Sequence, residues 1–186
     1  MAISVKLDFE NCYNLKEVSP DLKISKFETK VIDGLQILLK IEIANLPHEL
    51  VKDLYNFAFG PTDSRGKIDD KAELSHANYS KVFSTILLSG LTYLTKNPQH
   101  YLGIDGSNEA RAHLYYRFIQ SNYDYLSQHF NLFGLKYYVR ISRFGKRQYD
   151  NPFDFEDILP KISPISKGEK PASGKLYNYF VFNLKK

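Results

Sequence analysis

Alternating apolar and polar positions predict β-strands in the first third of the chain. Residues 3–9 alternate in this way, and a loop containing Pro20 follows. Two further runs, 24–32 and 35–44, flank Asp33-Gly34, a dipeptide typical of tight hairpin turns. The odd-numbered positions of the second run are all leucine or isoleucine, so one face of that strand is predicted to be buried.

The middle of the chain changes to a helical period. Apolar residues between Val82 and Leu94 recur three or four positions apart, with Asn78 or Ser80 as the expected N-cap and Asn97-Pro98 as the stop. The other elements predicted from residue 53 onwards are strands at 53–59, 67–74, 100–104, 132–143 and 176–184 and a helix at 108–129. Together these elements predict an α+β fold. A mixed, mainly antiparallel sheet of about six to eight strands is expected, with two helices packed on one face.

Length and composition narrow the class of protein. The 186 residues fit a single domain spanning 1–186, and a net charge of +4 is mild, so any contact with nucleic acid requires local clustering of basic residues. The single cysteine, Cys12, excludes a disulfide framework or a cysteine-based zinc site within one chain. The N-terminus lacks the apolar core of a signal peptide, and the apolar stretch from Val82 to Leu94 is too short and polar for a membrane span. A cytoplasmic location is therefore expected.

The strongest local feature lies at 105–115, where a predicted strand runs into a predicted helix. Backbone N–H groups at a helix start attract anions, Gly106 would let a ligand approach closely, and the Ser107 hydroxyl could bind it. Helical spacing places Arg111 on the inward-facing stripe, where a charge needs a partner. Gly106, Ser107 and Arg111 therefore predict an anion or phosphate site. The alternative is structural: Ser107 is only the N-cap, and Arg111 pairs with a core carboxylate or with strand-end carbonyls.

The same turn carries the run Gly-Ser-x-x-Ala-Arg-x-x-Leu-Tyr, from Gly106 to Tyr115. The other matching segments are the strand Leu54–Gly60, the segment 67–70, the helix from Lys81, the strand at 133–135 and the terminal strand. Over about residues 20–140 and the last ten, the chain resembles a family of small uncharacterised bacterial proteins, a domain of unknown function. The resemblance implies membership and brings no activity. The segment 145–175 looks longer than is usual in that family and is predicted to be an insertion or a mobile loop. Its part from residue 160 is rich in Pro, Ser, Gly and Lys.

A second candidate site is a basic and aromatic strand. Between Leu126 and Tyr149 the chain has no acidic residue, and its basic residues other than His129 are Lys136, Arg140, Arg143, Lys146 and Arg147. On a strand, Lys136, Tyr138 and Arg140 share one face, which is expected to be exposed. Basic groups beside tyrosine rings suit single-stranded nucleic acid, because they offer charge for phosphates and surfaces for stacking. The alternative is a solvated face whose positive charges are compensated by the acidic stretch 150–157.

Several common chemistries are set aside. Asp21, followed by Glu28 and Lys30, resembles a metal-dependent nuclease pattern, but the spacing leaves no room for a turn between two strands. The five histidines show no metal-ligand spacing, although His100 and His113 flank the turn at 105–107. No metal site and no cofactor is predicted.

Three functions remain open. The first is a binding module for nucleic acid or another phosphate-bearing ligand, with a bacterial stress or defence system as one hypothesis for its setting. The second is an enzyme that acts on a phosphorylated or acyl substrate at 105–115, with Asp105 or His100 as a titratable partner. The third is a protein-interaction or homodimeric structural protein that uses a tyrosine-rich surface and a sheet edge.

Overall fold

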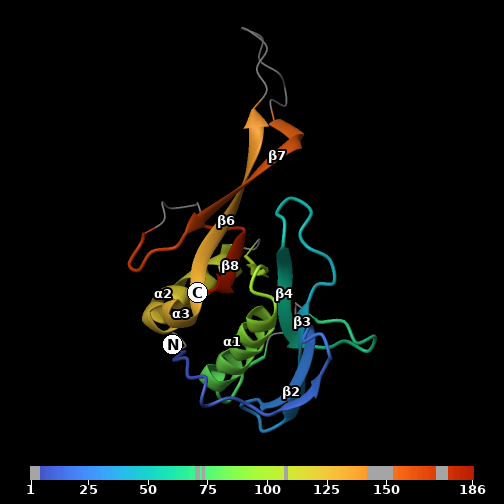
Figure 1. Cartoon of the computed structure of the whole chain (residues 1–186). Coiled ribbons are helices and arrows are strands. Elements are labelled where there is room, and N and C mark those ends of the chain that lie inside the picture. Colours follow the sequence, from blue (N-terminus) through green and yellow to red (C-terminus); the bar gives the residue numbers. More distant parts are fainter. Residues whose placement is uncertain (1–4, 70–71, 73, 107–108, 142–152, 171–175) are drawn as a thin grey trace, which may run out of the picture.

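The structure is a computed structural model of the chain, and it describes residues 5–69, 72, 74–106, 109–141, 153–170 and 176–186. In this part of the chain, eight strands form one sheet in the order β1-β2-β3-β4-β5-β8-β6-β7, accompanied by three helices (Figure 1). The strands are β1 (Leu15–Val18), β2 (Ile24–Lys30), β3 (Gln36–Ile43), β4 (Leu54–Pro61), β5 (Tyr101–Asp105), β6 (Phe130–Ile141), β7 (Phe153–Pro164) and β8 (Tyr179–Leu184). The helices are α1 (Tyr79–Lys96), α2 (Glu109–Ser121) and α3 (Tyr123–His129).

The sheet is mixed, and one parallel pair organises its centre. β4 and β5 run parallel, with Leu54 opposite Tyr101, whereas the other pairs of named strands in the described residues are antiparallel. The predicted α+β class with a mainly antiparallel sheet is confirmed. Because α1 connects β4 to β5, these elements form a βαβ unit whose two strands end at the same edge of the sheet.

All three helices contribute to a core on one face of the sheet. On this face Phe57 of β4, Leu102 of β5 and Phe180 of β8 are buried. A Cβ atom at Gly90 of α1 would lie 3.1 Å from Phe57 Cζ and 3.2 Å from Leu102 Cδ1, so a glycine lets α1 approach closely. Tyr115 of α2 meets Phe180 edge to face, with ring centroids 6.1 Å apart. The helices therefore share one apolar layer with the sheet.

The number of helices differs from the prediction because the helix expected at 108–129 is divided at Asn122. This side chain is buried, and its Oδ1 accepts a hydrogen bond from the Leu7 N–H at 3.0 Å. Its Nδ2 donates to the carbonyls of Val5 and Phe118, both at 3.0 Å. Asn122 thus interrupts the helix where it binds the N-terminal segment, which gives three helices instead of two.

The strand predicted at 3–9 is wrong for the part that the structure describes, from Val5 onwards. Backbone N–H groups of this segment donate to side chains of helices: Lys6 to Ser80 Oγ at 2.9 Å, Asp8 to Ser84 Oγ at 2.9 Å and Phe9 to Tyr125 Oη at 2.7 Å. The alternation of the sequence is still meaningful, because Leu7 is buried. The segment crosses helices, however, and pairs with no strand among the described residues.

Two turn and cap predictions are confirmed, and one strand is not. Gly34 has φ +93° in the turn between β2 and β3, and the Asn78 side chain accepts a hydrogen bond from the Lys81 N–H at 2.9 Å as the N-cap of α1. The return strand predicted at 67–74 is reduced to one bridge, between Thr62 and Ile68, in the described residues. Residues 70, 71 and 73 lie outside the described part.

The C-terminal segment also departs from the prediction. Residues 160–164, expected to begin a loop, belong to β7, and a strand at an edge of the sheet tolerates Pro160 and Pro164 because it has no neighbour on one side. Beyond β7, Gln120 Nε2 donates to the Ser166 carbonyl at 2.9 Å, and the Gly168 N–H donates to Gln120 Oε1 at 2.7 Å. The segment 165–170 is therefore bonded to α2, whereas 171–175 lie outside the described residues. The short strand β1 was not predicted.

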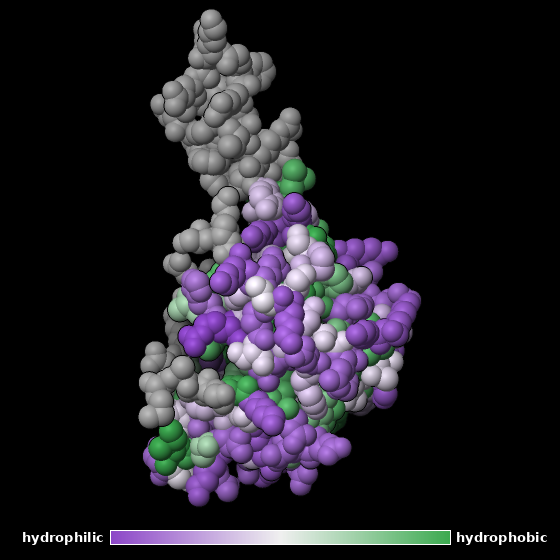
Figure 2. Space-filling view, turned by 90° about the vertical axis from the view of Figure 1, so that its left-hand side faces the viewer, coloured by the Kyte–Doolittle hydropathy of each residue, from purple (hydrophilic) through white to green (hydrophobic). Residues whose placement is uncertain are grey.

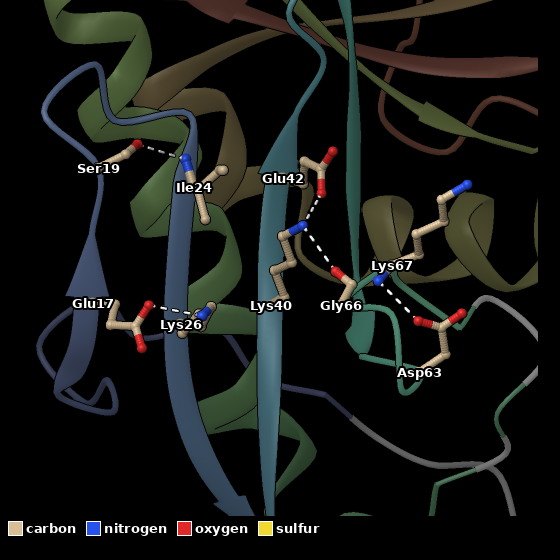
Figure 3. A network of polar contacts seen from close by, with 9 residues as sticks. All are labelled: Glu17, Ser19, Ile24, Lys26, Lys40, Glu42, Asp63, Gly66 and Lys67. Carbon is tan, nitrogen blue, oxygen red and sulfur yellow. Dashed lines mark hydrogen bonds and ion pairs between the residues drawn. The ribbon is translucent and has the colours of Figure 1, made fainter.

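Charged side chains on β2 and β3 form a local network on the outer face of the sheet (Figure 3). Lys26 pairs with Glu17 at 2.7 Å, and Lys40 contacts both Glu42 and the Gly66 carbonyl. Ion pairs at a protein surface usually contribute little to stability. They do compensate the charges of these lysines on this face.

One face of the molecule has a mostly hydrophilic surface (Figure 2). The face shown in Figure 2, which is the left-hand side of Figure 1, is mostly hydrophilic, with small separate hydrophobic patches. Among the described residues, no helix is both long and apolar enough to span a membrane.

Candidate functional site

A cavity of about 370 Å³ lies where β4 and β5 end, on the face of the sheet that carries the helices. Residues of β4 and β5, the N-terminal half of α1, α2 and the segment that connects β4 to α1 surround it. We call it the Arg111 cavity. Its polar lining residues are Asn56, Asp69, His76, Tyr79, Asp105, Arg111 and Tyr115, and its aromatic lining includes Phe57, Phe59 and Phe83.

The βαβ unit explains the position of this cavity. The segments that leave β4 and β5 both start at the same edge of the sheet, since the two strands are parallel. Side chains on these segments therefore converge, and ligands of open sheets with parallel strands commonly bind outside the carboxyl ends of those strands. Helical spacing predicted that Arg111 faces inward, and its side chain is half-buried in the wall of this cavity.

The charged groups of the Arg111 cavity are engaged within the protein. Asp69, Asp105 and Arg111 each take part in interactions with other protein groups. Burial raises the pKa of the Tyr115 hydroxyl, the Arg111 charge opposes this shift, and the Asp105 charge adds to it. Tyr115, Arg111 and Asp105 all line this cavity, so it contains a phenol, a guanidinium group and a carboxylate.

His76 gives the cavity a neutral ring. Burial lowers the pKa of His76, whose ring meets Tyr79 edge to face with centroids 5.3 Å apart. His76 Nδ1 lies 3.5 Å from Thr29 Oγ1, and the backbone of His76 forms a bridge with Val31. These contacts hold the segment before α1 against β2 and thereby close one side of the cavity.

Gly106 is accounted for by packing. Its N–H donates to the Asn178 carbonyl at 2.7 Å, and a Cβ atom at this position would lie 2.9 Å from Phe180 Cε2 and 3.0 Å from the Tyr177 carbonyl oxygen. The glycine therefore lets the chain pass close to β8, and its N–H already has an acceptor. Ser107, the third member of the predicted anion site, lies outside the described residues.

His100, considered above as a titratable partner of the turn, lies at the other end of β5. Its Nδ1 is 2.8 Å from Tyr93 Oη, and its ring packs against Tyr55 with centroids 4.6 Å apart. His100 does not line the Arg111 cavity, whereas Asp105 does. Asp105 is thus the one of the two proposed partners that the fold brings to Arg111.

The basic strand forms part of the β6–β7 hairpin, which extends beyond the rest of the sheet in Figure 1. Tyr138 is 49% exposed and lies opposite Leu159, which is 58% exposed. Lys136 lies opposite Lys161, and its ammonium group sits 4.9 Å from the centre of the Tyr177 ring. This cation–π contact holds one of the predicted nucleic-acid residues against the body of the protein.

The remaining basic residues are less completely described. In the backbone register of the hairpin, Arg140 lies opposite Asp154. Arg143, Lys146 and Arg147 lie outside the described residues. The nucleic-acid site therefore stays a prediction, with its best-described part at Lys136 and Tyr138.

Comparison with known proteins identifies a family. The family model described as "Family of unknown function (DUF6934)" matches residues 10–158. The chain belongs to this family. Neither a curated protein nor a solved structure matches the chain. Membership in DUF6934 agrees with the expectation of a family of unknown function. The match takes in the βαβ unit, α2 and the first part of β7, and it ends before the terminal strand that the resemblance included.

The DUF6934 chain has a second cavity, of about 620 Å³, which the sequence did not indicate. Its lining includes His48 and Glu49 from the segment between β3 and β4, Tyr137 of β6 and Tyr179 of β8, and it shares Asp105 with the Arg111 cavity. Among the described residues, no group of three or more His, Cys, Asp or Glu side chains is placed to hold a metal ion.

Proposed function

We propose that this DUF6934 protein is a binding module for a small phosphate-bearing ligand, which it holds in the Arg111 cavity. The observation that carries the proposal is the cavity itself, at the carboxyl ends of the two strands of the βαβ unit, with Arg111 in its wall. Its volume of about 370 Å³ lies in the range usual for ligand pockets.

The lining fits a ligand with an anionic group and an apolar body. Arg111 supplies the positive charge, and α2 begins two residues before it, so the positive end of the helix dipole adds to that charge. Phe57, Phe59 and Phe83 offer aromatic surface to the rest of the ligand. The proposal allows Arg111 to keep its present interactions, because a guanidinium group has five N–H donors and can serve several acceptors.

The carboxylates of the cavity restrict the ligand further. Asp69 and Asp105 would repel an anion that lacked donor groups of its own. They can accept hydrogen bonds from hydroxyl groups of the same ligand. A phosphorylated sugar or nucleoside combines a phosphate with such hydroxyls and is therefore the favoured class.

Matched ligand pairs test this function. Binding of a nucleoside monophosphate and its nucleoside, and of a sugar phosphate and its sugar, can be compared by calorimetry and thermal shift. The proposal expects the phosphorylated member of at least one pair to bind at least about tenfold more tightly, which corresponds to about 1.4 kcal/mol. Equal affinity within both pairs, or no binding of any member, would argue against it.

An exposed leucine at the rim provides the sharpest variants. Leu114 lines the cavity but is 57% exposed, so charged substitutions there should leave folding intact. Leu114→Glu should weaken binding of the phosphorylated ligand roughly fivefold, and Leu114→Lys should preserve or strengthen that binding. The reason is that one added charge at the rim of the cavity is worth about 1 kcal/mol. Leu159, on the distant hairpin and 58% exposed, gives the matched control pair Leu159→Glu and Leu159→Lys.

A second candidate function is contact with single-stranded nucleic acid at the β6–β7 hairpin. The exposed Tyr138 ring next to Lys136 and Lys161 favours it, since one stacked base and nearby phosphates could be bound together. Affinity for an oligonucleotide should fall steeply with salt. In the double variant Tyr138→Ala, Lys161→Ala, affinity for the oligonucleotide should fall roughly tenfold or more. The exposed control Lys52→Ala should keep its affinity. Affinity that ignores ionic strength would contradict this candidate.

A further inference from the structure

The second cavity lies on the face of the sheet opposite the helices. Tyr137 and Tyr179 pack there against a small apolar cluster of Leu54, Leu135 and Val181, which is separate from the main core. The segment 44–53 between β3 and β4 covers this cluster through Val51 and brings His48 to the two tyrosines. We call this site the Tyr137 cavity.

The hydrogen bonds of His48 define its tautomer. The Leu50 N–H donates to His48 Nδ1 at 3.1 Å, so Nδ1 carries no proton. The other ring nitrogen, Nε2, lies 2.7 Å from Tyr137 Oη, and with Nδ1 as an acceptor it is the donor of that hydrogen bond.

Three rings form an aromatic wall with two orientations. The rings of His48 and Tyr137 are nearly parallel, with centroids 5.8 Å apart and an angle of 17°. The Tyr179 ring is nearly perpendicular to both, at 78° to His48 and 79° to Tyr137. His48, Tyr137 and Tyr179 all line the cavity, so it offers aromatic surface to an organic group.

The charged groups of this cavity have the same sign. Asp105 and Glu49 line it, and the described lining includes no lysine or arginine. Burial, followed by the influence of Tyr179 and Asp105, raises the pKa of Tyr137 to about 12, and burial and Asp105 also raise the pKa of Tyr179. Both hydroxyls therefore remain protonated at neutral pH, and Glu49 and Asp105 are the charged groups in the described lining of the cavity.

We propose that the Tyr137 cavity binds a small organic cation with an alkylammonium group, held by the rings of Tyr137 and Tyr179 and by the charges of Asp105 and Glu49. Cation–π attraction of this kind recognises ammonium groups, and it strengthens when water is displaced. The proposal goes beyond the function assigned to the Arg111 cavity, because it concerns the other face of the sheet and a ligand of opposite charge.

Choline and its uncharged isostere 3,3-dimethylbutan-1-ol test the inference on the full chain. The two molecules have nearly the same shape, so their difference in affinity, measured by calorimetry, reports the contribution of the charge. Choline should bind about tenfold or more tightly than the alcohol. Equal affinity of the two, or no heat of binding for choline at millimolar concentration, would overturn the proposal.

Variants assign the binding to this cavity. Glu49 is exposed, so Glu49→Gln should fold normally and weaken choline roughly threefold to fivefold, with Glu10→Gln as an exposed control outside the cavity. Tyr179→Leu should remove most of the binding, whereas Tyr137→Phe, which keeps the ring, should change it less than threefold. Choline affinity that is unchanged in both Glu49→Gln and Tyr179→Leu would overturn the assignment. A phosphorylated ligand of the Arg111 cavity should bind all of these variants as it binds the wild type, so failure of one proposal is distinguishable from failure of the other.

Discussion

The two cavities lie on opposite faces of one sheet and share Asp105, yet they differ in what surrounds that residue. On the helix-bearing face, Arg111 of α2 adds a positive charge beside aromatic walls. On the other face, the second cavity is lined by Glu49 and two tyrosines, and its described lining has no arginine. Under the two proposals, the elements packed on each face of the sheet, more than the strand end itself, set the charge of the ligand that each cavity binds.

The largest effect on ligand binding is expected when one cavity is filled. Ala72 is exposed and lines the Arg111 cavity, so Ala72→Trp should occupy that space without removing any charged group. Calorimetry should then show loss of measurable binding of the phosphorylated ligand and unchanged binding of choline. Loss of both ligands would mean that the two cavities are not independent.

Crowding the opposite face is expected to have the next largest effect. A Cβ atom at Gly103 would lie 3.0 Å from Tyr179 Cδ1 and 3.1 Å from Leu54 Cδ1. Gly103→Ala should therefore displace Tyr179 and lower the free energy of unfolding by about 1–3 kcal/mol, measured by chemical denaturation. Choline binding should weaken while the phosphorylated ligand is unaffected. An unchanged free energy of unfolding would show that the side chains at this contact adjust without strain.

Removing the shared carboxylate should change the affinities of the two ligands in opposite directions. Asp105→Asn removes one negative charge from both cavities. Choline should bind roughly fivefold more weakly, and the phosphorylated ligand should bind equally well or more tightly, because one charge at close range is worth about 1 kcal/mol. A change of the same sign for both ligands would contradict the charge argument.

A smaller effect is expected from the hydrogen bond between His48 and Tyr137. Tyr137→Phe removes the acceptor of the His48 Nε2–H but keeps the ring. The free energy of unfolding should fall by about 1 kcal/mol, as for a typical hydrogen bond, while affinity in the Arg111 cavity stays the same. The unfolding transition of the Tyr179→Phe variant, measured in parallel, controls for loss of a hydroxyl without this histidine bond.

The smallest effect concerns pH and His76. Burial lowers the pKa of His76, so the unfolded chain takes up a proton near pH 6.5 that the folded protein resists. Stability should therefore fall as the pH drops below about 6.5, and this part of the decrease should be reduced in His76→Gln. Identical pH profiles of unfolding for the two proteins would show that His76 is readily protonated in the folded state.

Local patterns predicted the elements that depend on neighbours in the sequence. The Asp33-Gly34 turn, the cap at Asn78 and the inward position of Arg111 follow from short-range geometry, and the structure has all three. The edge strand β7 was not predicted because Pro160 and Pro164 argue against a strand. A proline is tolerated where one side of a strand lacks a neighbour, and the sequence alone does not show this.

Long-range side-chain contacts could not be predicted in this way. Asn122 divides a periodic helix by bonding to Val5 and Leu7, more than a hundred residues away in the chain. His48 meets Tyr137 only because the segment between β3 and β4 folds over the sheet, and the spacing of the two residues gives no signal of it. The Tyr137 cavity was missed for this reason, whereas the turn at 105–111 was found from local sequence.

Nuclear magnetic resonance of the backbone amides in the isotope-labelled protein can show whether the two cavities bind different ligands. One titration uses the best phosphorylated ligand and the other uses choline. We expect the phosphorylated ligand to shift signals around Arg111 and Leu114, and choline to shift signals around His48, Tyr137 and Tyr179. Shifts of one common set of residues by both ligands, or no shifts around either cavity, would contradict this expectation.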